Sequence, residues 1–322
     1  MKWIDSKINK MKSVPRYEQR GTAIIRYRAA RGREDTMGDY YQVSQIGKGR
    51  YRIFDPLGVF TDLFVGSERA LLWDTSYGFR DLRAVVKSLT DLPLYVVNSH
   101  GHIDHACGNY QFDEPIYIHP ADIPVLRDHH GAYRKKLAVE MARNAVDSLT
   151  GKPVNAIDQD FDMQAYLERP VGDLREVREG FVFDLGGMHL EVIEVPGHTP
   201  GSIGLLYREE KVFYAGDSMN DDLWLFLKEA CPLSVYKETL KKAWQLDFDT
   251  LIMSHSPVPL DKKVLLDYMD TAEQLDYSKA FPFSAPLTPE ADARRFVREG
   301  FTPDDIGKPG YAGIVICEEK IR

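Results

Sequence analysis

The chain has 322 residues, of which 43% are hydrophobic and 28% are charged, and its formal net charge is −8. This is the composition of a globular protein long enough for one large core and an appendage, and no apolar run approaches the length of a membrane span. The negative charge disfavours binding to a nucleic-acid backbone, which normally requires a basic face.

Residues 1–40 are predicted to form a polar, partly helical N-terminal extension. This segment is locally basic, a pattern more typical of a solvated helix face than of a binding site for an anion or a partner. The first residues, Met1–Asp5, carry charge instead of the apolar stretch of a signal peptide, so we expect a cytoplasmic protein.

Short apolar runs bounded by turn residues predict most of the strands. Residues 59–65 and 70–74 should form a hairpin, and helical spacing predicts a helix over Phe79–Leu89. From residue 121 to about residue 170 the pattern is helical and polar, which predicts an inserted helical segment. The other strands predicted before and after this segment are Leu94–Val97, Ile116–Ile118, Phe181–Phe183, Leu190–Val195, Ile203–Tyr207, Val212–Ala215 and Thr250–Met253.

The remaining elements complete a mixed α/β chain. A helix is predicted over Ser234–Leu246 and another after Pro259, followed by a Pro-rich loop at residues 281–289 and a last strand at Ile314–Ile316. Hairpins argue against a purely parallel sheet, so we expect two stacked sheets with helices outside. The expected domain is residues 41–258, and residues 259–322 should be an extension that packs on its core.

The strongest chemical signal is the HxHxDH motif of residues 100–105. In an extended segment alternate side chains point the same way, so His100 and His102 can converge on one ion. Asp104 and His105, at the following turn, can face a second ion. Imidazole and carboxylate groups are suitable ligands for zinc and for iron.

Three further candidates stand where predicted strands break into loops. His198 lies in the sequence PGHTPGS, Asp217 in AGDS and His255 in MSHS. A rigid strand end is a good support for a preorganised site. A single histidine at such a place is usually not a ligand, but these signals in this order are hard to obtain by chance. The histidines that we interpret as surface or ordinary packed residues are His119, His129, His130 and His189.

These motifs resemble those of the metallo-β-lactamase superfamily, in particular the group that includes hydroxyacylglutathione hydrolases and acyl-homoserine lactonases. The resemblance covers about residues 40–258 and implies a four-layer αββα sandwich with two divalent ions. The ligands implied for the first ion are His100, His102 and His198, those for the second are Asp104, His105 and His255, and Asp217 would bridge the two. Asp74 matches an aspartate that orients the ligating histidines.

The resemblance implies a hydroxide between the ions, because metal binding lowers the pKa of water toward ~7. Asp104 would orient this nucleophile, and the expected reaction is the cleavage of an ester, thioester or lactone of a small molecule. Zinc is favoured because redox di-iron members carry a carboxylate where this chain has His102, whereas iron and manganese stay open. We expect no nucleic-acid or membrane partner, and a homodimer stays open.

Two other activities of the same fold also stay open. Persulfide dioxygenases keep a similar HxHxDH motif with one iron, and phosphodiesterases or nucleases act on phosphorus. The stretch Ser218–Asp222 lacks the tyrosine of acyl-homoserine lactonases, and no match to the glutathione-binding patch of hydroxyacylglutathione hydrolases follows Pro259. Both differences disfavour those particular substrates.

The substrate pocket is expected beside the ligand loops, where an apolar wall would suit an acyl chain. The candidate side chains are Tyr77, Phe79, Met219, Trp224 and Phe226. The alternative for residues 224–227 is a short helix that packs in the core. Cys107 is close to the motif but is predicted to be a small buried thiol, because the three cysteines are far apart and form no CxxC pair.

Overall fold

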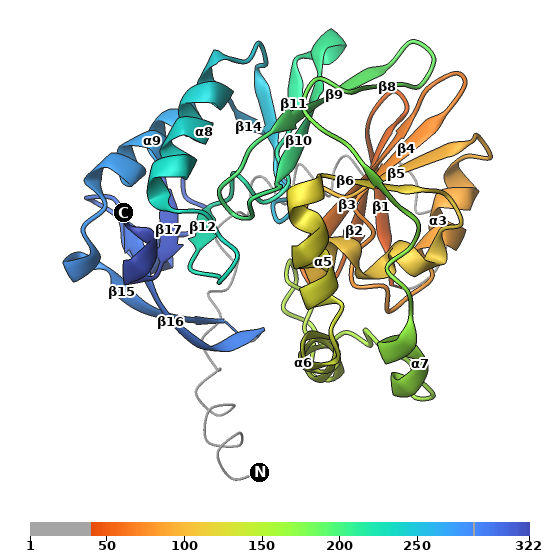
Figure 1. The fold of residues 1–322 in the computed structure, drawn as a ribbon, viewed down its shortest axis with the longest axis horizontal. Helices are drawn as coiled ribbons and strands as arrows, with labels where there is room; N and C mark the ends of the chain where they lie inside the picture. The colour runs from red at the N-terminus through yellow and green to blue at the C-terminus, as the bar shows by residue number, and fades with distance from the viewer. Residues whose placement is uncertain (1–39, 286) are drawn as a thin grey trace.

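The computed structural model describes residues 40–285 and 287–322, which form three β-sheets and the helices around them (Figure 1). The predicted N-terminal extension, apart from Tyr40, lies outside the described residues. The division of the chain at residues 40 and 258 therefore remains a proposal.

The first sheet has seven strands that follow one another in chain order. They are β1 (Gln42–Gly47), β2 (Arg50–Asp55), β3 (Val59–Val65), β4 (Ala70–Trp73), β5 (Leu94–Val97), β6 (Ile116–Ile118) and β7 (Leu174–Glu176). Strands β1 to β4 are antiparallel, and β4 to β7 are parallel. The predicted hairpin is confirmed, since β3 pairs with β4 from Asp62 opposite Trp73 to Val65 opposite Ala70.

The second sheet has six strands in the order β14-β13-β11-β10-β9-β8. They are β8 (Val182–Asp184), β9 (His189–Glu194), β10 (Ile203–Tyr207), β11 (Val212–Tyr214), β13 (Thr250–Ile252) and β14 (Leu260–Asp261). Neighbours are antiparallel except β11 and β13, which are parallel and joined through helix α8 (Leu233–Gln245). The strands and the helix predicted in this region are confirmed.

Alternating side chains place helices outside the two sheets. Leu71 of β4 and Leu205 of β10 belong to the core between the sheets, whereas their neighbours Leu72 and Leu206 face the outer layers. On the outer side of the first sheet lie α3 (Leu82–Leu89), α6 (Ala132–Arg143) and α7 (Met163–Glu168), and on that of the second lie α8 and α9 (Val264–Gln274). The predicted αββα sandwich is confirmed.

Helix α3 begins three residues later than the predicted Phe79–Leu89. Its start is fixed by Asp81, whose carboxylate accepts a hydrogen bond from the backbone nitrogen of Ala84 at 2.8 Å. Such an N-cap satisfies a backbone donor that has no partner within the helix. The capping side chain therefore excludes Phe79 and Arg80 from the helix.

The predicted helical insertion lies between β6 and β7 and is only partly helical. It contains α5 (Ile123–His129), α6 and α7, and residues 144–162 between α6 and α7 are not helical. In that stretch Gly151 has a positive φ of 67°, and Val146 forms an isolated β-bridge with Pro153. Glycine and proline both disfavour helix, which explains the interruption.

The third sheet corrects two expectations. Its order is β12-β17-β16-β15, formed by β12 (Asp222–Leu225), β15 (Phe281–Ala285), β16 (Thr288–Val297) and β17 (Gly313–Ile316). The Pro-rich loop expected at residues 281–289 is wrong, because Pro282 lies in the edge strand β15, where a missing N–H is tolerated. The helix considered for residues 224–227 is also wrong, because β12 pairs in parallel with the predicted last strand, β17.

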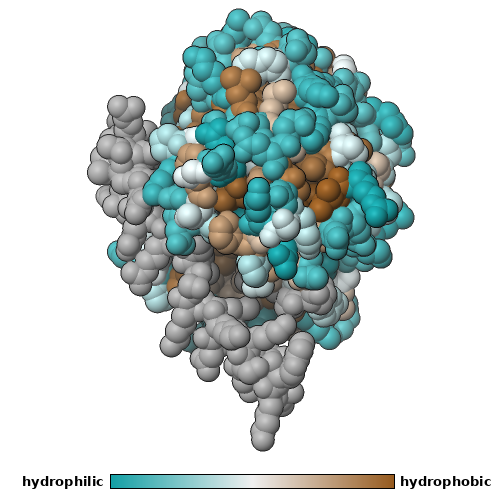
Figure 2. Space-filling view, turned by 90° about the vertical axis from the view of Figure 1, so that its left-hand side faces the viewer, coloured by the Kyte–Doolittle hydropathy of each residue, from teal (hydrophilic) through white to brown (hydrophobic). Residues whose placement is uncertain are grey.

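Helices α8 and α9 and the third sheet lie together on one side of the molecule (Figure 1). Figure 2 shows this side as mainly hydrophilic, with separate apolar areas. The exposed large apolar side chains on these elements are Val235, Leu266 and Phe281. No helix in the described part of the chain has the length and apolarity needed to cross a lipid bilayer.

Candidate metal centre

The HxHxDH motif runs from the end of β5 into the short helix α4 (Ile103–Ala106). The backbone of His102 is extended, with φ −71° and ψ 156°, whereas Asp104 and His105 lie within the helix. Gly101 is required here, because a Cβ at this position would lie 2.4 Å from the backbone nitrogen of Leu126. The change from extended chain to helix separates the first pair of side chains from the second.

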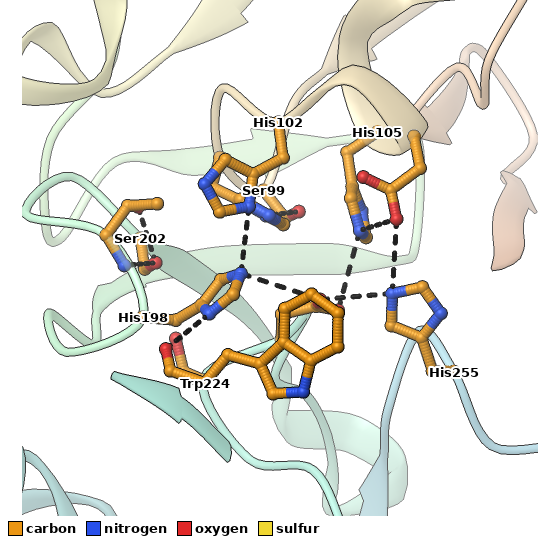
Figure 3. A network of polar contacts seen from close by, with 12 residues as sticks. Ser99, His102, His105, His198, Ser202, Trp224 and His255 are labelled. Carbon is orange, nitrogen blue, oxygen red and sulfur yellow. Dashed lines mark hydrogen bonds and ion pairs between the residues drawn. The ribbon is translucent and has the colours of Figure 1, made fainter. Parts of the chain in front are cut away.

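The other candidates come from the second sheet. His198, Asp217 and His255 follow β9, β11 and β13, which run in one direction, so their carboxyl ends lie at the same edge. Gly216 has a φ of 56°, a left-handed conformation that glycine adopts without strain, immediately before Asp217. This edge faces the motif that follows β5, and Figure 3 shows side chains from both sheets converging.

The first group consists of His100, His102 and His198. One ligand-type atom from each lies within 4.8 Å of the others. His102 Nδ1 and His198 Nε2 are 2.9 Å apart. All three rings are buried, with exposures of 1%, 5% and 3%.

The second group consists of Asp104, His105 and His255. Asp104 Oδ2 is 3.5 Å from His105 Nε2 and 3.5 Å from His255 Nε2. Asp217 lies between the groups, because its Oδ2 is 3.7 Å from His198 Nε2 and 3.0 Å from His255 Nε2. The seven predicted ligands are thus brought into one cluster.

This cluster fits divalent metal ions. Among the described residues, three of its buried atoms have no hydrogen-bond partner: His100 Nε2, His105 Nε2 and Asp217 Oδ1. Buried polar atoms without a partner are unfavourable unless something else binds them. Ligand atoms at about 2.0–2.1 Å from a tetrahedral zinc ion lie roughly 3.3 Å apart, close to the spacing of the second group. The donor set of imidazole and carboxylate suits the same ions.

In each histidine of the cluster, the ring nitrogen that faces away from the other ligands forms a hydrogen bond with a fixed partner. Such partners orient metal ligands and set their tautomers. The pairs are His100 Nδ1 with Ser99 Oγ at 2.9 Å, His102 Nε2 with Glu229 Oε1 at 2.9 Å, His105 Nδ1 with Asp74 Oδ2 at 2.9 Å, His198 Nδ1 with the Trp224 carbonyl at 2.9 Å and His255 Nδ1 with the Gly58 carbonyl at 2.7 Å. Asp74 thus contacts His105, one of the proposed ligands, on the side that faces away from the cluster.

Burial sets the charge of the first group. Burial, together with neighbouring histidines, lowers the pKa of His100 well below the ordinary value and that of His102 to about 3. In the second group burial also lowers the pKa of His105, but the carboxylates of Asp104 and Asp217 outweigh it and raise that pKa. Neutral imidazoles and ionised carboxylates are the forms that bind metal ions.

Asp122 ties the two ligand-bearing loops together. Its Oδ2 accepts hydrogen bonds from the Gly101 nitrogen at 2.6 Å and from Thr199 Oγ1 at 2.9 Å, and its Oδ1 accepts one from the Gly201 nitrogen at 2.7 Å. Burial raises the pKa of Asp122 to about 6, against the effect of these hydrogen bonds. One carboxyl group thus fixes the loops of His100 and His198 relative to each other.

The family model of the metallo-beta-lactamase superfamily matches residues 55–255, more than half of the chain. The chain belongs to the metallo-beta-lactamase superfamily. The resemblance inferred from the motifs is therefore confirmed, and the chain is a member of a superfamily of metallo-hydrolases.

Curated relatives in the superfamily include a thioesterase and a hydrolase. Acyl-coenzyme A thioesterase MBLAC2 of Gallus gallus is 30% identical over 168 residues, which are 48% of this chain and 56% of the relative. Hydroxyacylglutathione hydrolase GloC of Haemophilus influenzae is 45% identical over 40 residues, which are 12% of this chain and 19% of the relative. The chain spans about half the length of the thioesterase that it matches.

Two solved structures share the fold of this chain. The stereoselective inverting sec-alkylsulfatase Pisa1 from Pseudomonas sp. aligns with a TM-score of 0.56 at 15% identity, covering 72% of this chain and 42% of that chain. A metallo-beta-lactamase from Pontibacter korlensis aligns with a TM-score of 0.50 at 15% identity, covering 73% and 100%. At this identity the likeness shows the fold alone.

A cavity of about 380 Å³ opens over the ligand cluster of this superfamily member. Its wall includes Met141 from the helical insertion and Leu287 from the turn between β15 and β16. Other apolar side chains of the wall are Leu57, Ile103, Trp224 and Leu227. The cavity thus pairs an apolar wall with a polar, ligand-rich floor.

The structure separates the five candidate pocket residues. Tyr77 and Trp224 line this cavity. Phe79 packs in the core against Tyr77, whereas Met219 is fully buried in the core of α8 and α9, because both side chains point into the packed layers. Phe226 lines a neighbouring cavity of about 930 Å³.

Two residues near the cluster were not predicted from the sequence. Glu229 lies beside His102, and His129, interpreted as a surface or packed histidine, lines the cavity and contacts the same carboxylate. Neither has a local motif, so the sequence alone offered no signal for Glu229 and only the residue type for His129. Cys107 is buried next to Tyr166 Oη at 3.2 Å, which confirms the prediction of a buried thiol.

Proposed function

We propose that this protein is a dinuclear zinc hydrolase that cleaves an ester, thioester or lactone of a small molecule. The observation that carries the proposal is the convergence of seven histidine and aspartate side chains on the floor of a cavity, with buried atoms that have no partner among residues 40–285 and 287–322. His100, His102 and His198 would hold one ion and Asp104, His105 and His255 the other, with Asp217 between them.

The ions, when bound, supply Lewis acidity that activates water and stabilises negative charge on the substrate oxygen. Asp104 lines the cavity and can accept a hydrogen bond from the attacking water, which it thereby orients. Tyr77 also lines the cavity; burial and nearby carboxylates raise the pKa of its hydroxyl, so it stays a hydrogen-bond donor for the substrate. Hydrolysis joins the water oxygen to the acyl carbon, breaks the bond to the leaving oxygen or sulfur, and passes the water proton to that leaving group.

The cavity favours an acyl substrate over a highly charged one. Its apolar wall can bury a hydrocarbon chain at roughly 0.8 kcal/mol for each methylene group. The 30% identity with an acyl-coenzyme A thioesterase supports a thioester as the bond that is cleaved. We therefore place acyl thioesters first among the candidate substrates.

Elemental analysis combined with a substrate panel tests this proposal. The panel contains acyl thioesters and acyl esters of increasing chain length, lactones, phosphodiesters and a glutathione persulfide. We expect two zinc ions per chain, and a kcat/KM for acyl thioesters that rises with chain length. One iron per chain with oxygen consumption on the persulfide would point to a dioxygenase instead, and activity on phosphodiesters alone would point to a phosphodiesterase.

A further inference from the structure

A second cluster of polar side chains adjoins the proposed first ion without belonging to its ligand set. Glu229 Oε1 lies 2.9 Å from His102 Nε2 and 2.9 Å from His129 Nε2. The side chains are 14%, 6% and 6% exposed, in that order. One carboxylate oxygen therefore accepts hydrogen bonds from two buried imidazoles, one of which is a proposed ligand.

The geometry decides which nitrogen of His102 carries the proton. His102 Nδ1 faces His198 Nε2 at 2.9 Å, on the side of the first ion. A nitrogen that binds a metal has no proton, so with the first ion held at Nδ1 the proton of the neutral ring would lie on Nε2 and be donated to Glu229. A third ion between His102, His129 and Glu229 would have to bind His102 Nε2. The ring would then bind an ion through each nitrogen and carry no proton, so hydrogen bonding explains this cluster better.

We propose that Glu229 is a positioning residue for the first metal site, which holds His102 with Nδ1 directed at the ion. This inference rests on the proposed metal centre. His129 holds the same carboxylate through its Nε2. Its ring also stacks on that of His102, with centroids 4.3 Å apart and an angle of 26° between the planes. It lies at the end of α5, so the insertion helps to fix a ligand that belongs to the motif after β5.

The backbone that carries Glu229 is held on both sides. Glu229 lies in the turn closed by the hydrogen bond from Ala230 N to Leu227 O at 3.0 Å. Cys231 N donates to the Gly197 carbonyl at 2.8 Å, next to His198, and Lys320 Nζ donates to the Lys228 carbonyl at 3.0 Å. A carboxylate on such a fixed turn can orient an imidazole without a large loss of side-chain entropy.

The segment of residues 224–229, which ends in this turn, supports two of the three proposed ligands of the first ion. Trp224, at the start of this segment, accepts the hydrogen bond from His198 Nδ1 through its carbonyl oxygen. Trp224 lies in β12, which pairs with β17 near the C-terminus. Strand β12 thus supports His198, and the turn that follows it supports His102 through Glu229.

Zinc titration of Glu229→Ala and Glu229→Gln against a competing chelator tests the inference. We expect Glu229→Ala to bind zinc about 10–100-fold more weakly at one of the two sites, the usual effect of removing a partner that orients a ligand. Glu229→Gln keeps the shape and one acceptor oxygen, so it should fold normally and show a smaller but measurable loss. Both variants should also shift the absorption bands of the cobalt-substituted protein.

Glu194→Gln is the matched control, because Glu194 Oε1 accepts a hydrogen bond from His119 Nε2 at the same 2.9 Å, away from the ligand cluster. It should leave zinc affinity and the cobalt spectrum unchanged. Wild-type affinity and spectrum in both Glu229 variants would overturn the inference. So would three zinc ions in the wild type and two in Glu229→Gln, since Glu229 would then be a ligand. These readouts need no substrate, so a failure of the proposed hydrolysis would leave the inference standing.

Discussion

At the scale of single residues, the cluster is preorganised by the partners of its ligands. Each of its five histidines directs one ring nitrogen inward and gives the other to a hydroxyl, carbonyl or carboxylate oxygen. Among the carboxylates, Asp217 has the central place, because it lies within 3.7 Å of three histidine nitrogens from different loops. Its removal should therefore affect both proposed ions.

We predict that Asp217→Ala loses bound metal and at least about 10³-fold in turnover, because the bridging carboxylate and part of the charge that holds the ions disappear. Elemental analysis and kinetic assay of the purified variant check this. His189→Ala is the control, since His189 is half exposed and pairs with Glu209, away from the cluster. Wild-type metal content in Asp217→Ala, or metal loss in His189→Ala, would contradict the assignment.

At the scale of elements, neighbouring strands fix the loop that carries His255. Arg52 of β2 stands directly opposite Asp62 of β3, with Nε 3.0 Å from Oδ1. The Arg52 guanidinium also donates to the carbonyls of Met253 and Ser256 at 2.8 Å each, on either side of His255. This buried ion pair thus connects the first sheet with a ligand loop of the second.

The pH dependence of stability should report on this pair. Burial raises the pKa of Asp62 to about 6, although the charge of Arg52 opposes the rise. A carboxyl group whose pKa is higher in the folded state stabilises the protein fully below its unfolded pKa and loses that contribution as the pH rises through the folded pKa. Relative to Asp62→Asn, the wild-type free energy of unfolding should fall by about 3 kcal/mol between pH 3 and pH 7 and stay level above.

Urea unfolding of the wild type and of Asp62→Asn over this pH range measures the difference. The variant is a suitable reference because asparagine has the shape of the protonated aspartic acid and can still accept a hydrogen bond from Arg52. A difference that stays constant, or that grows with pH, would show that Asp62 is ionised throughout in the folded protein.

At the scale of the whole molecule, all three sheets contribute to one site. The first supplies the HxHxDH motif and Asp74, the second supplies His198, Asp217 and His255, and the third supplies Trp224. Leu287 and Thr288 near the C-terminus complete the cavity wall, although they lie beyond the matched residues 55–255. The cavity wall therefore includes parts of the chain outside the residues that match the family model.

Because the proposed ions bind only where these parts meet, their removal should destabilise the whole fold. We predict that a chelator lowers the Tm by an amount on the order of 5 °C, and that added zinc restores it, since a ligand that binds only the folded state stabilises that state. Thermal unfolding followed by circular dichroism, with and without chelator, checks this. An unchanged Tm after verified metal removal would contradict a structural contribution of the ions.

The sequence by itself determined the local features of this protein. Apolar runs and turn residues predicted the hairpin of β3 and β4 and the strands before His198, Asp217 and His255, because alternation and turn chemistry act over a few residues. The short motifs singled out seven side chains that the structure brings together. Strand ends at one sheet edge made that convergence predictable.

Only the tertiary structure decided which distant groups support these side chains. Glu229 is 127 residues from His102 and lies in a turn without a motif, so its position depends on the packing of β12 and on the contacts of residues 197 and 320. The strand at Pro282 was likewise decided by its place at the edge of a sheet, where no neighbour requires the missing N–H. These contacts form only when the layers pack together, so local sequence patterns do not predict them.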